Sequence, residues 1–329
     1  MAGYNTIRGL RVKYLSADPS NPEDGQVWYN STTGNLRVKG VAIAAFASAA
    51  ALPTGTSTYN RAGTMTAGLF AGGNTSTGFS TATYEWNGSG WTSGGAIGTA
   101  LYSNTGFGTQ TAGASAAGRP TNGSSGDTNA TFEYDGSSWT SVNAANLAAR
   151  TRQSFGIQTA AAMVGGFSQS GGSYTNATEE YDGTNWTTVT VMPAATASAN
   201  AIGTQTAAIV SLGGAPTVAT TYVAYDGTNW TSSPSANIAR ARSAAGGTGA
   251  TSTAGLVIGG TPYNPSVVAE TWDGTSWANS ASITTARYGA GVSDGNTNGI
   301  IAGGRTAPGF ETAVEEFTVV TTARNITTS

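Results

Sequence analysis

The chain of 329 residues contains no cysteine and no histidine. The absence of cysteine excludes disulfide bonds and thiolate metal ligands from the fold. The absence of histidine removes the commonest general base, so any chemistry would depend on carboxylates, tyrosine, serine and threonine. The sequence therefore favours a non-enzymatic protein that holds no metal and no cofactor.

Charge is also scarce. Charged residues make up 9% of the chain, against about 25% in an average soluble protein. The formal net charge is -3 and no basic cluster is present, which argues against nucleic-acid binding. The most apolar stretch, residues 41–52, is shorter than the roughly 20 residues of a membrane-spanning helix, and residues 1–20 lack the apolar core of a signal peptide. We expect neither membrane insertion nor export by a signal peptide.

One motif occurs five times: an aromatic residue, a turn that is Asp-Gly in four copies, and a tryptophan. The copies run over residues 84–91, 134–139, 181–186, 225–230 and 272–277. Their final tryptophans are 48, 47, 44 and 47 residues apart. A period of this length is typical of β-propeller blades.

Double glycines follow the same period. They stand at Gly72-Gly73, Gly165-Gly166, Gly213-Gly214, Gly259-Gly260 and Gly303-Gly304, and a single Gly118 stands where the remaining pair is due. The chain therefore contains six units. Because glycine is costly inside a strand, its repetition predicts a close approach of backbones, which we place near the axis of a propeller.

The third unit illustrates how one repeat forms four antiparallel strands. Residues 152–157 and 160–164 predict one hairpin. Residues 178–181 and 186–190 flank an Asp-Gly turn and predict a second hairpin, because glycine accepts the positive φ that such turns require. The repeated rings, each burying about 150–250 Å², are expected to pack between adjacent sheets rather than to stack on a ligand.

This order of apolar strand, double glycine, variable loop, aromatic residue and tryptophan resembles the kelch repeat family. The resemblance covers residues 41 to about 317 and implies an all-β, six-bladed kelch-like β-propeller, which we assign to residues 41–329. The sixth unit lacks its Asp-Gly hairpin and tryptophan, whereas residues 44–49 align with a last strand and place Phe46 at the tryptophan position. An N-terminal strand is therefore expected to close the last blade. Residues 319–329 either add a strand or trail free.

Residues 1–40 form a separate N-terminal arm. Alternation on both sides of residues 30–34 predicts a β-hairpin, which needs a partner because an isolated hairpin is marginally stable. Residues 13–38 resemble the N-terminal hairpin of tail-fibre-like structural proteins of marine phages. That resemblance implies a virion protein, made in the host cytoplasm and extracellular after lysis, whose arm binds other virion proteins. The attachment residues are then Val27, Trp28, Tyr29 and Leu36.

Recognition is expected in the loops that follow the double glycines, because these vary most in length and content on a repeated scaffold. Exposed aromatic rings and arginines are the side chains that most often anchor a ligand. The alternative is that the loops are variable surface without a ligand. The candidate contacts are Phe79, Arg119, Phe167, Tyr174, Tyr263, Arg305 and Phe310.

Arginines recur before the first strand of a unit and glutamates recur on the third strand. This pattern predicts structural Arg–Glu pairing within or between blades, and the alternative is a ring of charges that lines a substrate channel. The residues are Arg61, Arg150, Arg152, Arg240, Arg242 and Arg287, and Glu85, Glu133, Glu180, Glu270 and Glu316. Residues 294–299 match the start of a calcium loop, but the twelfth position is Arg305 instead of an acid, so we predict a hairpin turn there.

Three functions follow for testing. The first is a tail-fibre or capsid-surface appendage that binds a host-surface glycan or another virion protein through propeller loops. The second is a secreted bacterial adhesin. The third is a glycan-processing propeller enzyme, but galactose oxidase-like copper chemistry needs histidine and cysteine, and a sialidase-like site needs clustered arginines. The oligomeric state stays open, with the arm as the feature that hints at a homo-oligomer.

Overall fold

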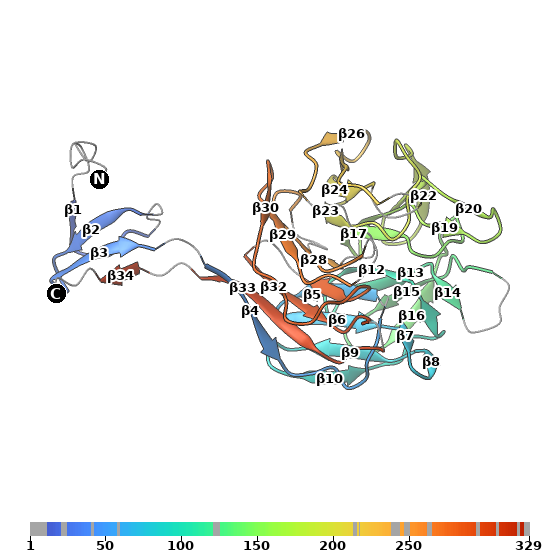
Figure 1. The fold of residues 1–329 in the computed structure, drawn as a ribbon. Coiled ribbons are helices and arrows are strands. Elements are labelled where there is room, and N and C mark those ends of the chain that lie inside the picture. The colour runs from blue at the N-terminus through green and yellow to red at the C-terminus, as the bar shows by residue number, and fades with distance from the viewer. Residues whose placement is uncertain are drawn as a thin grey trace. The chain divides into compact units, whose positions relative to one another are not determined.

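The computed structural model describes residues 12–20, 25–40, 43–57, 60–120, 126–212, 216, 218–237, 244–246, 251–261, 265–293, 297–306, 309–320 and 323–325. The chain divides into two compact units, Met1–Ala45 with Val319–Ser329, and Phe46–Thr318. The described residues are all-β and contain no helix (Figure 1), hence no helix that could cross a membrane.

Six four-stranded antiparallel sheets account for most of the large unit. Sheet 1 consists of β5 (Asn60–Thr64), β6 (Ala67–Ala71), β9 (Thr83–Trp86) and β10 (Trp91–Gly94). Sheet 2 consists of β12 (Thr105–Gly108), β13 (Gly113–Ala116), β15 (Thr131–Tyr134) and β16 (Trp139–Val142). Sheet 3 consists of β17 (Gln153–Ile157), β18 (Ala160–Val164), β21 (Thr178–Tyr181) and β22 (Trp186–Val189). Sheet 4 consists of β23 (Ala201–Thr204), β24 (Ala207–Ser211), β25 (Tyr222–Tyr225) and β26 (Trp230–Ser233). Sheet 5 consists of β27 (Ala244–Gly246), β28 (Gly255–Ile258), β29 (Ala269–Trp272) and β30 (Trp277–Asn279). Sheet 6 consists of β31 (Gly291–Ser293), β32 (Asn298–Ala302), β33 (Val314–Val320) and β4 (Ile43–Ala49).

The first strands of the six sheets are neighbours in chain order. β5 lies beside β12, β12 beside β17, β17 beside β23, β23 beside β27, and β27 beside β31. β31 also lies beside β5, so the order returns to its start. The second and third strands follow outward in each sheet, and the tryptophan strand is the outermost in sheets 1 to 5.

The fourth strand of sheet 6 comes from the start of the chain. β4 occupies the outer position beside β33, where the sequence analysis expected an N-terminal strand. The Phe46 ring lies 5.0 Å from the fully buried Phe317 ring, centroid to centroid. Phe46 therefore takes the packing position that a tryptophan holds in the other sheets.

Within the described residues, the glycines that follow the second strands join one sheet to the segment that precedes the next, whereas Gly213 and Gly214 lie outside the described residues. The Gly166 N–H donates to Thr196 O at 2.7 Å, just before sheet 4, and the Gly304 N–H donates to Thr56 O at 2.8 Å, just before sheet 1. Gly165 and Gly166 have φ values of 60° and 112°, and a Cβ on Gly165 would lie 2.4 Å from Thr196 O. The predicted close approach is present, and its partner is the segment that precedes the next sheet.

The Asp-Gly turns form as predicted. In sheet 3, Asp182 Oδ1 accepts the N–H groups of Thr184 and Asn185 at 2.8 and 2.7 Å. These hydrogen bonds, that from Asn185 foremost, lower the pKa of Asp182. Gly183 has a φ of 90°, which a side chain would strain. Each hairpin is thus determined by a few adjacent residues.

The repeated rings pack between adjacent sheets, as predicted: Phe107 of sheet 2 lies in one buried cluster with Tyr181 and Trp186 of sheet 3. Three tyrosine hydroxyls also donate to a glutamate of the preceding sheet. The pairs are Tyr134–Glu85, Tyr181–Glu133 and Tyr225–Glu180, at 2.5, 2.9 and 2.8 Å. Burial, followed by the bond to Glu85, raises the pKa of Tyr134 to about 12. These glutamates bind tyrosines and not the arginines that the sequence analysis predicted.

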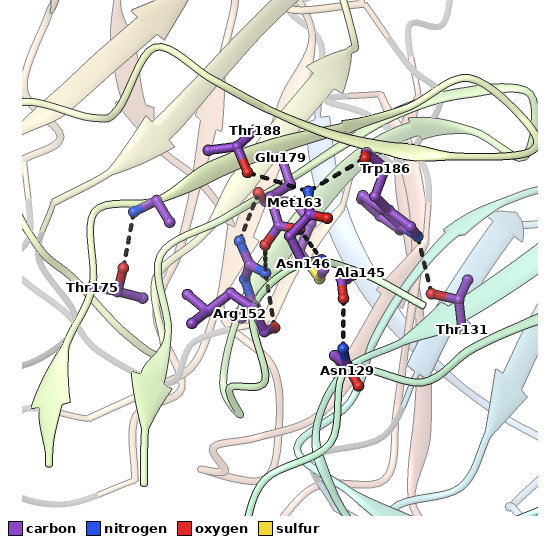
Figure 2. A network of polar contacts seen from close by, with 12 residues as sticks. Asn129, Thr131, Ala145, Asn146, Arg152, Met163, Thr175, Glu179, Trp186 and Thr188 are labelled. Carbon is purple, nitrogen blue, oxygen red and sulfur yellow. Dashed lines mark hydrogen bonds and ion pairs between the residues drawn. The ribbon is translucent and has the colours of Figure 1, made fainter. Parts of the chain in front are cut away.

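Arginine–glutamate pairs do occur, but their glutamate stands one residue earlier in the third strand than the glutamate predicted from the sequence. Arg152 pairs with Glu179, not Glu180, and the two side chains are 0% and 1% exposed (Figure 2). Glu179 Oε2 also accepts the Asn146 N–H at 2.6 Å. Arg287 pairs in the same way with Glu315, not Glu316. Because these pairs are buried, they cannot line an open substrate channel. Arg240 and Arg242 lie outside the described residues.

The small unit is a four-stranded sheet in the order β1 (Lys13–Leu15), β2 (Val27–Asn30), β3 (Asn35–Lys39) and β34 (Ala323–Asn325). β2 and β3 form the predicted hairpin. β1 adds to it in parallel, and β34 pairs with β3 in antiparallel register. The C-terminal tail therefore adds a strand to the small unit, which differs from the expected assignment of residues 41–329 to one domain.

A polar network holds the small unit together. Asp18 Oδ1 accepts the Asn30 amide at 2.8 Å and the Trp28 indole N–H at 2.9 Å, and Arg37 pairs with the other carboxylate oxygen. The bonds from Asn30 and Trp28, the largest causes, lower the pKa of Asp18. Trp28 is fully buried, so it stabilises this sheet from within.

Candidate functional site

The candidate contact residues lie on small additional β-structures at one end of the sheets. β7 (Asn74–Thr75) pairs with β8 (Gly78–Phe79), β11 (Leu101–Tyr102) with β14 (Arg119–Pro120), and β19 (Phe167–Ser168) with β20 (Ser173–Tyr174). Arg305 and Phe310 form a further bridge. Each structure includes residues that closely follow the end of a second strand, so we call this region the loop end. Tyr263 lies outside the described residues.

The largest cluster at the loop end surrounds Phe167. The guanidinium carbon of Arg150 lies 4.7 Å from the centroid of the Phe167 ring, and the Tyr174 ring meets that ring edge-on at 5.2 Å. Arg150 donates to Asp127 Oδ1 at 2.8 Å and to Gln169 Oε1 at 3.0 Å. Asp127 belongs to the loop of sheet 2, so the cluster joins two adjacent loops.

Exposure within this cluster is graded. The Asp127 side chain is 1% exposed and that of Arg150 is 20% exposed, whereas Tyr174 is 38% exposed. The buried carboxylate thus fixes the guanidinium, which in turn lies over the aromatic ring. The result is a preorganised surface that consists of the Phe167 and Tyr174 rings, packed edge to face, and the partly exposed Arg150 guanidinium.

A second aromatic pair lies between the loops of sheets 1 and 2. The rings of Phe79 and Tyr102 stack at 5.1 Å with an interplanar angle of 14°. Tyr102 pairs with Arg119 across β11 and β14. All three side chains are partly exposed. The structure therefore brings two of the predicted contacts together through Tyr102, which the sequence analysis did not select.

The third cluster follows the double glycine of sheet 6. The guanidinium carbon of Arg305 lies 5.0 Å from the centroid of the Phe310 ring. Thr306 Oγ1 donates to Glu311 Oε1 at 2.8 Å. Arg305 is exposed and Phe310 is half-buried. This arrangement repeats the arginine-on-aromatic contact of sheet 3.

Tyr102 and Arg150 could have been found from the repeat. Tyr102 directly follows Leu101, whose carbonyl accepts the Gly73 N–H. Arg150 directly follows Ala149, whose carbonyl accepts the Gly118 N–H. The sequence analysis assigned Arg150 to a glutamate instead. Asp127 offered no such signal, because it lies in a loop whose length and content differ from unit to unit.

The side chains of these clusters can contact a ligand through ring faces and guanidinium groups. Ring faces pack on apolar C–H surfaces, and guanidinium groups donate paired hydrogen bonds to hydroxyl, carboxylate or phosphate oxygens. The loop-end carboxylates Asp127 and Glu311 are engaged in the bonds given above. Within the described residues, no three Asp, Glu, His or Cys side chains gather closely enough to hold a metal ion.

The predicted attachment residues divide between the two faces of the small sheet. Strand alternation places Val27 and Tyr29 on one face and Trp28 on the other. Leu36 lies opposite Tyr29 in the register, and Tyr14, 75% exposed, stacks on Tyr29 at 5.0 Å. The accessible aromatic pair is thus Tyr14 with Tyr29, whereas Trp28 is buried.

Comparison with known proteins adds a fold relationship. No protein-family model matches the sequence, and a search of curated proteins found no match. The structure is similar to the solved structure of YjhT, with a TM-score of 0.66 and 16% sequence identity over 84% of this chain and 99% of that chain. At this identity the similarity shows the fold alone: both chains are β-rich and share one arrangement of strands.

Proposed function

We propose that the six sheets are the blades of a six-bladed, kelch-like β-propeller, and that the chain is a non-enzymatic virion protein of a phage. The proposed role is a tail-fibre or capsid-surface appendage that binds a host-surface polysaccharide through the loop end. The small unit, with Tyr14 and Tyr29, would attach it to another virion protein.

The Arg150–Phe167–Tyr174 cluster is the observation that carries the binding role. It presents an aromatic surface beside a guanidinium that a buried carboxylate holds in place. Such a surface suits a sugar ring, whose C–H face packs on an aromatic side chain while its hydroxyl or acidic groups accept from arginine. The circular order of first strands supports the propeller, and the resemblance of residues 13–38 to phage arms supports the virion role.

We expect the Tyr174→Ala variant to bind host-surface polysaccharide about tenfold more weakly, a loss of about 1.4 kcal/mol that is typical of an exposed aromatic anchor. Binding is measured by biolayer interferometry on immobilised polysaccharide from candidate host cells. Ile157→Ala is the matched control, because Ile157 is a 45% exposed apolar residue at the opposite end of sheet 3. Equal losses in both variants, or release of sugar products by the wild type, would contradict the proposal.

A further inference from the structure

A repeated glutamine bridges adjacent sheets at three interfaces. It stands at the turn between the first two strands of a sheet, and its carboxamide donates to two backbone carbonyls of the preceding sheet. Gln158 Nε2 donates to Gly113 O at 2.9 Å and to Tyr134 O at 3.1 Å. Gln205 does the same to Ala161 O and Tyr181 O, at 3.0 and 3.1 Å, and Gln110 bridges sheets 1 and 2.

The interface between sheets 4 and 5 lacks this bridge. Ser252 occupies the glutamine position: Thr253 lies against Gly274 as Thr159 lies against Gly183, and Gly255 pairs with Trp272 as Ala161 pairs with Tyr181. A serine side chain is too short to reach the preceding sheet. The carbonyls equivalent to those bound by Gln205 are Ala208 O and Tyr225 O, and no side chain of the described residues donates to either.

The second bridge of the repeat is also missing at this interface. Ala224 of sheet 4 is equivalent to Glu180 of sheet 3, because each directly precedes the tyrosine at the end of its third strand. Glu180 accepts a tyrosine hydroxyl from the next sheet, and alanine cannot. Trp272 stands in place of that tyrosine and donates its indole N–H to Ser252 O at 2.7 Å. Two larger polar side chains of the repeat, a glutamine and a glutamate, are therefore replaced by Ser252 and Ala224 at one place.

A cavity of about 330 Å³ occupies the space that these replacements leave, within the size range of small-ligand sites. Ala208, Ala224 and Tyr225 line it from sheet 4, and Ser252 and Trp272 line it from sheet 5. The cavity lies toward the Asp-Gly turns, at the opposite end of the strands from the loop end. It is therefore separate from the binding surface proposed above.

The cavity favours a ligand that donates hydrogen bonds and carries positive charge. Two carbonyl oxygens lie where a carboxamide is bound at three other interfaces, and Asp226 also lines the cavity. Hydrogen bonds from Asn229 and Thr228 lower the pKa of Asp226, so its carboxylate is ionised at neutral pH. None of the described lining residues is basic.

We infer that this cavity binds a planar guanidinium or amidinium group, whose paired N–H donors replace the missing glutamine amide at Ala208 O and Tyr225 O. The positive charge is attracted to Asp226, and the flat group packs against the aromatic wall. A small guanidino compound and an arginine side chain of a partner protein present the same chemistry. The inference does not depend on the proposed virion role.

The test is a titration of the full-length chain with agmatine, with acetyl-Gly-Arg-Gly-amide and with putrescine, followed by saturation-transfer NMR. We expect agmatine to bind at least tenfold more tightly than putrescine, which has charge without the planar fork. Tighter binding of agmatine than of the peptide identifies a small guanidino ligand, and the reverse identifies an arginine side chain; both support the inference. Equal binding of agmatine and putrescine overturns it.

Variants locate the site. Ser252→Gln restores the bridging amide and should weaken agmatine binding at least tenfold, whereas the matched Ser252→Ala variant should keep wild-type affinity. The double variant Glu180→Ala, Gln205→Ser, which removes both side-chain bridges between sheets 3 and 4, should create a second site and raise the stoichiometry from one to two. This variant keeps the inference testable if Ser252→Gln does not fold. Unchanged binding in a folded Ser252→Gln variant, or unchanged stoichiometry in a folded Glu180→Ala, Gln205→Ser variant, overturns the inference.

Discussion

The Arg152→Met variant is expected to lose about 3–5 kcal/mol of unfolding free energy at neutral pH, because a buried charge is left without its partner. Arg152 is 0% and Glu179 is 1% exposed. The guanidinium also donates to Met163 O at 3.2 Å. After the substitution, Glu179 would keep the Asn146 N–H as its hydrogen-bond donor, which offsets only part of the lost hydration of a carboxylate.

Urea unfolding of three variants measures this effect. The double variant Arg152→Met, Glu179→Gln should recover at least half of the loss. Arg305→Met, at an exposed arginine, should change stability by less than about 0.5 kcal/mol.

A loss below about 1 kcal/mol in Arg152→Met, or a double variant as unstable as the single one, would contradict this account of the pair. Such a result would mean that the carboxylate finds water or another donor when arginine is removed. The geometry of Figure 2 argues otherwise, because Glu179 is enclosed between the Asn146 segment and the strand that carries Met163.

The second large effect concerns the strand that completes sheet 6. We expect a chain of residues 51–320 to be less stable than a chain of residues 43–320 by at least about 3–5 kcal/mol, the cost of removing a packed phenylalanine. Removal of β4 deletes the Phe46–Phe317 contact and the bond from Trp91 Nε1 to Ala50 O, 2.8 Å long. It also exposes the edge of β33, which invites aggregation.

The two truncated chains differ only in β4 and Ala50, so each serves as the control for the other. Guanidinium unfolding gives their stabilities, and light scattering reports aggregation. A synthetic peptide of residues 43–50 should restore the shorter chain by adding a strand to the open edge. Equal unfolding midpoints for the two chains would show that sheet 6 is complete without β4.

The sequence predicted the parts of the fold that depend on short-range chemistry. Asp182 and Gly183 determine their hairpin through adjacent backbone groups, and such turns recur in each unit that has the motif. Phe46 could be aligned because the sixth unit lacks its own tryptophan strand. A repeat thus predicts both its regular elements and the place where one is missing.

Partner choice over long distances could not be predicted in the same way. Glu179 and Glu180 are adjacent and point to opposite sides of β21, so one binds Arg152 and the other binds Tyr225. Asp127 reaches Arg150 from a loop whose length and content vary between units. The C-terminal residues 323–325 pair with β3 across nearly the full chain, a contact that strand propensity alone does not predict.

The candidate site was predicted in composition more than in arrangement. The predicted contacts within the described residues lie at the loop end, but in separate clusters. Phe79 packs with Tyr102, Phe167 and Tyr174 pack with Arg150, and Arg305 packs with Phe310. The cavity beside Ser252 had no sequence signal until the bridging glutamines were placed, since a serine in a turn is ordinary. The role of Ser252 can be interpreted only once the carbonyl groups that a glutamine at this position would reach are known.

Quantitative mass spectrometry of purified phage particles tests the central proposal most directly. Particles are separated from lysate by density gradient, and the copy number of this chain is compared with those of the capsid and tail proteins. The account predicts that the chain copurifies with particles at a fixed copy number through successive gradients. Recovery of the chain only in the cell or soluble secreted fraction would contradict the virion role and favour an adhesin.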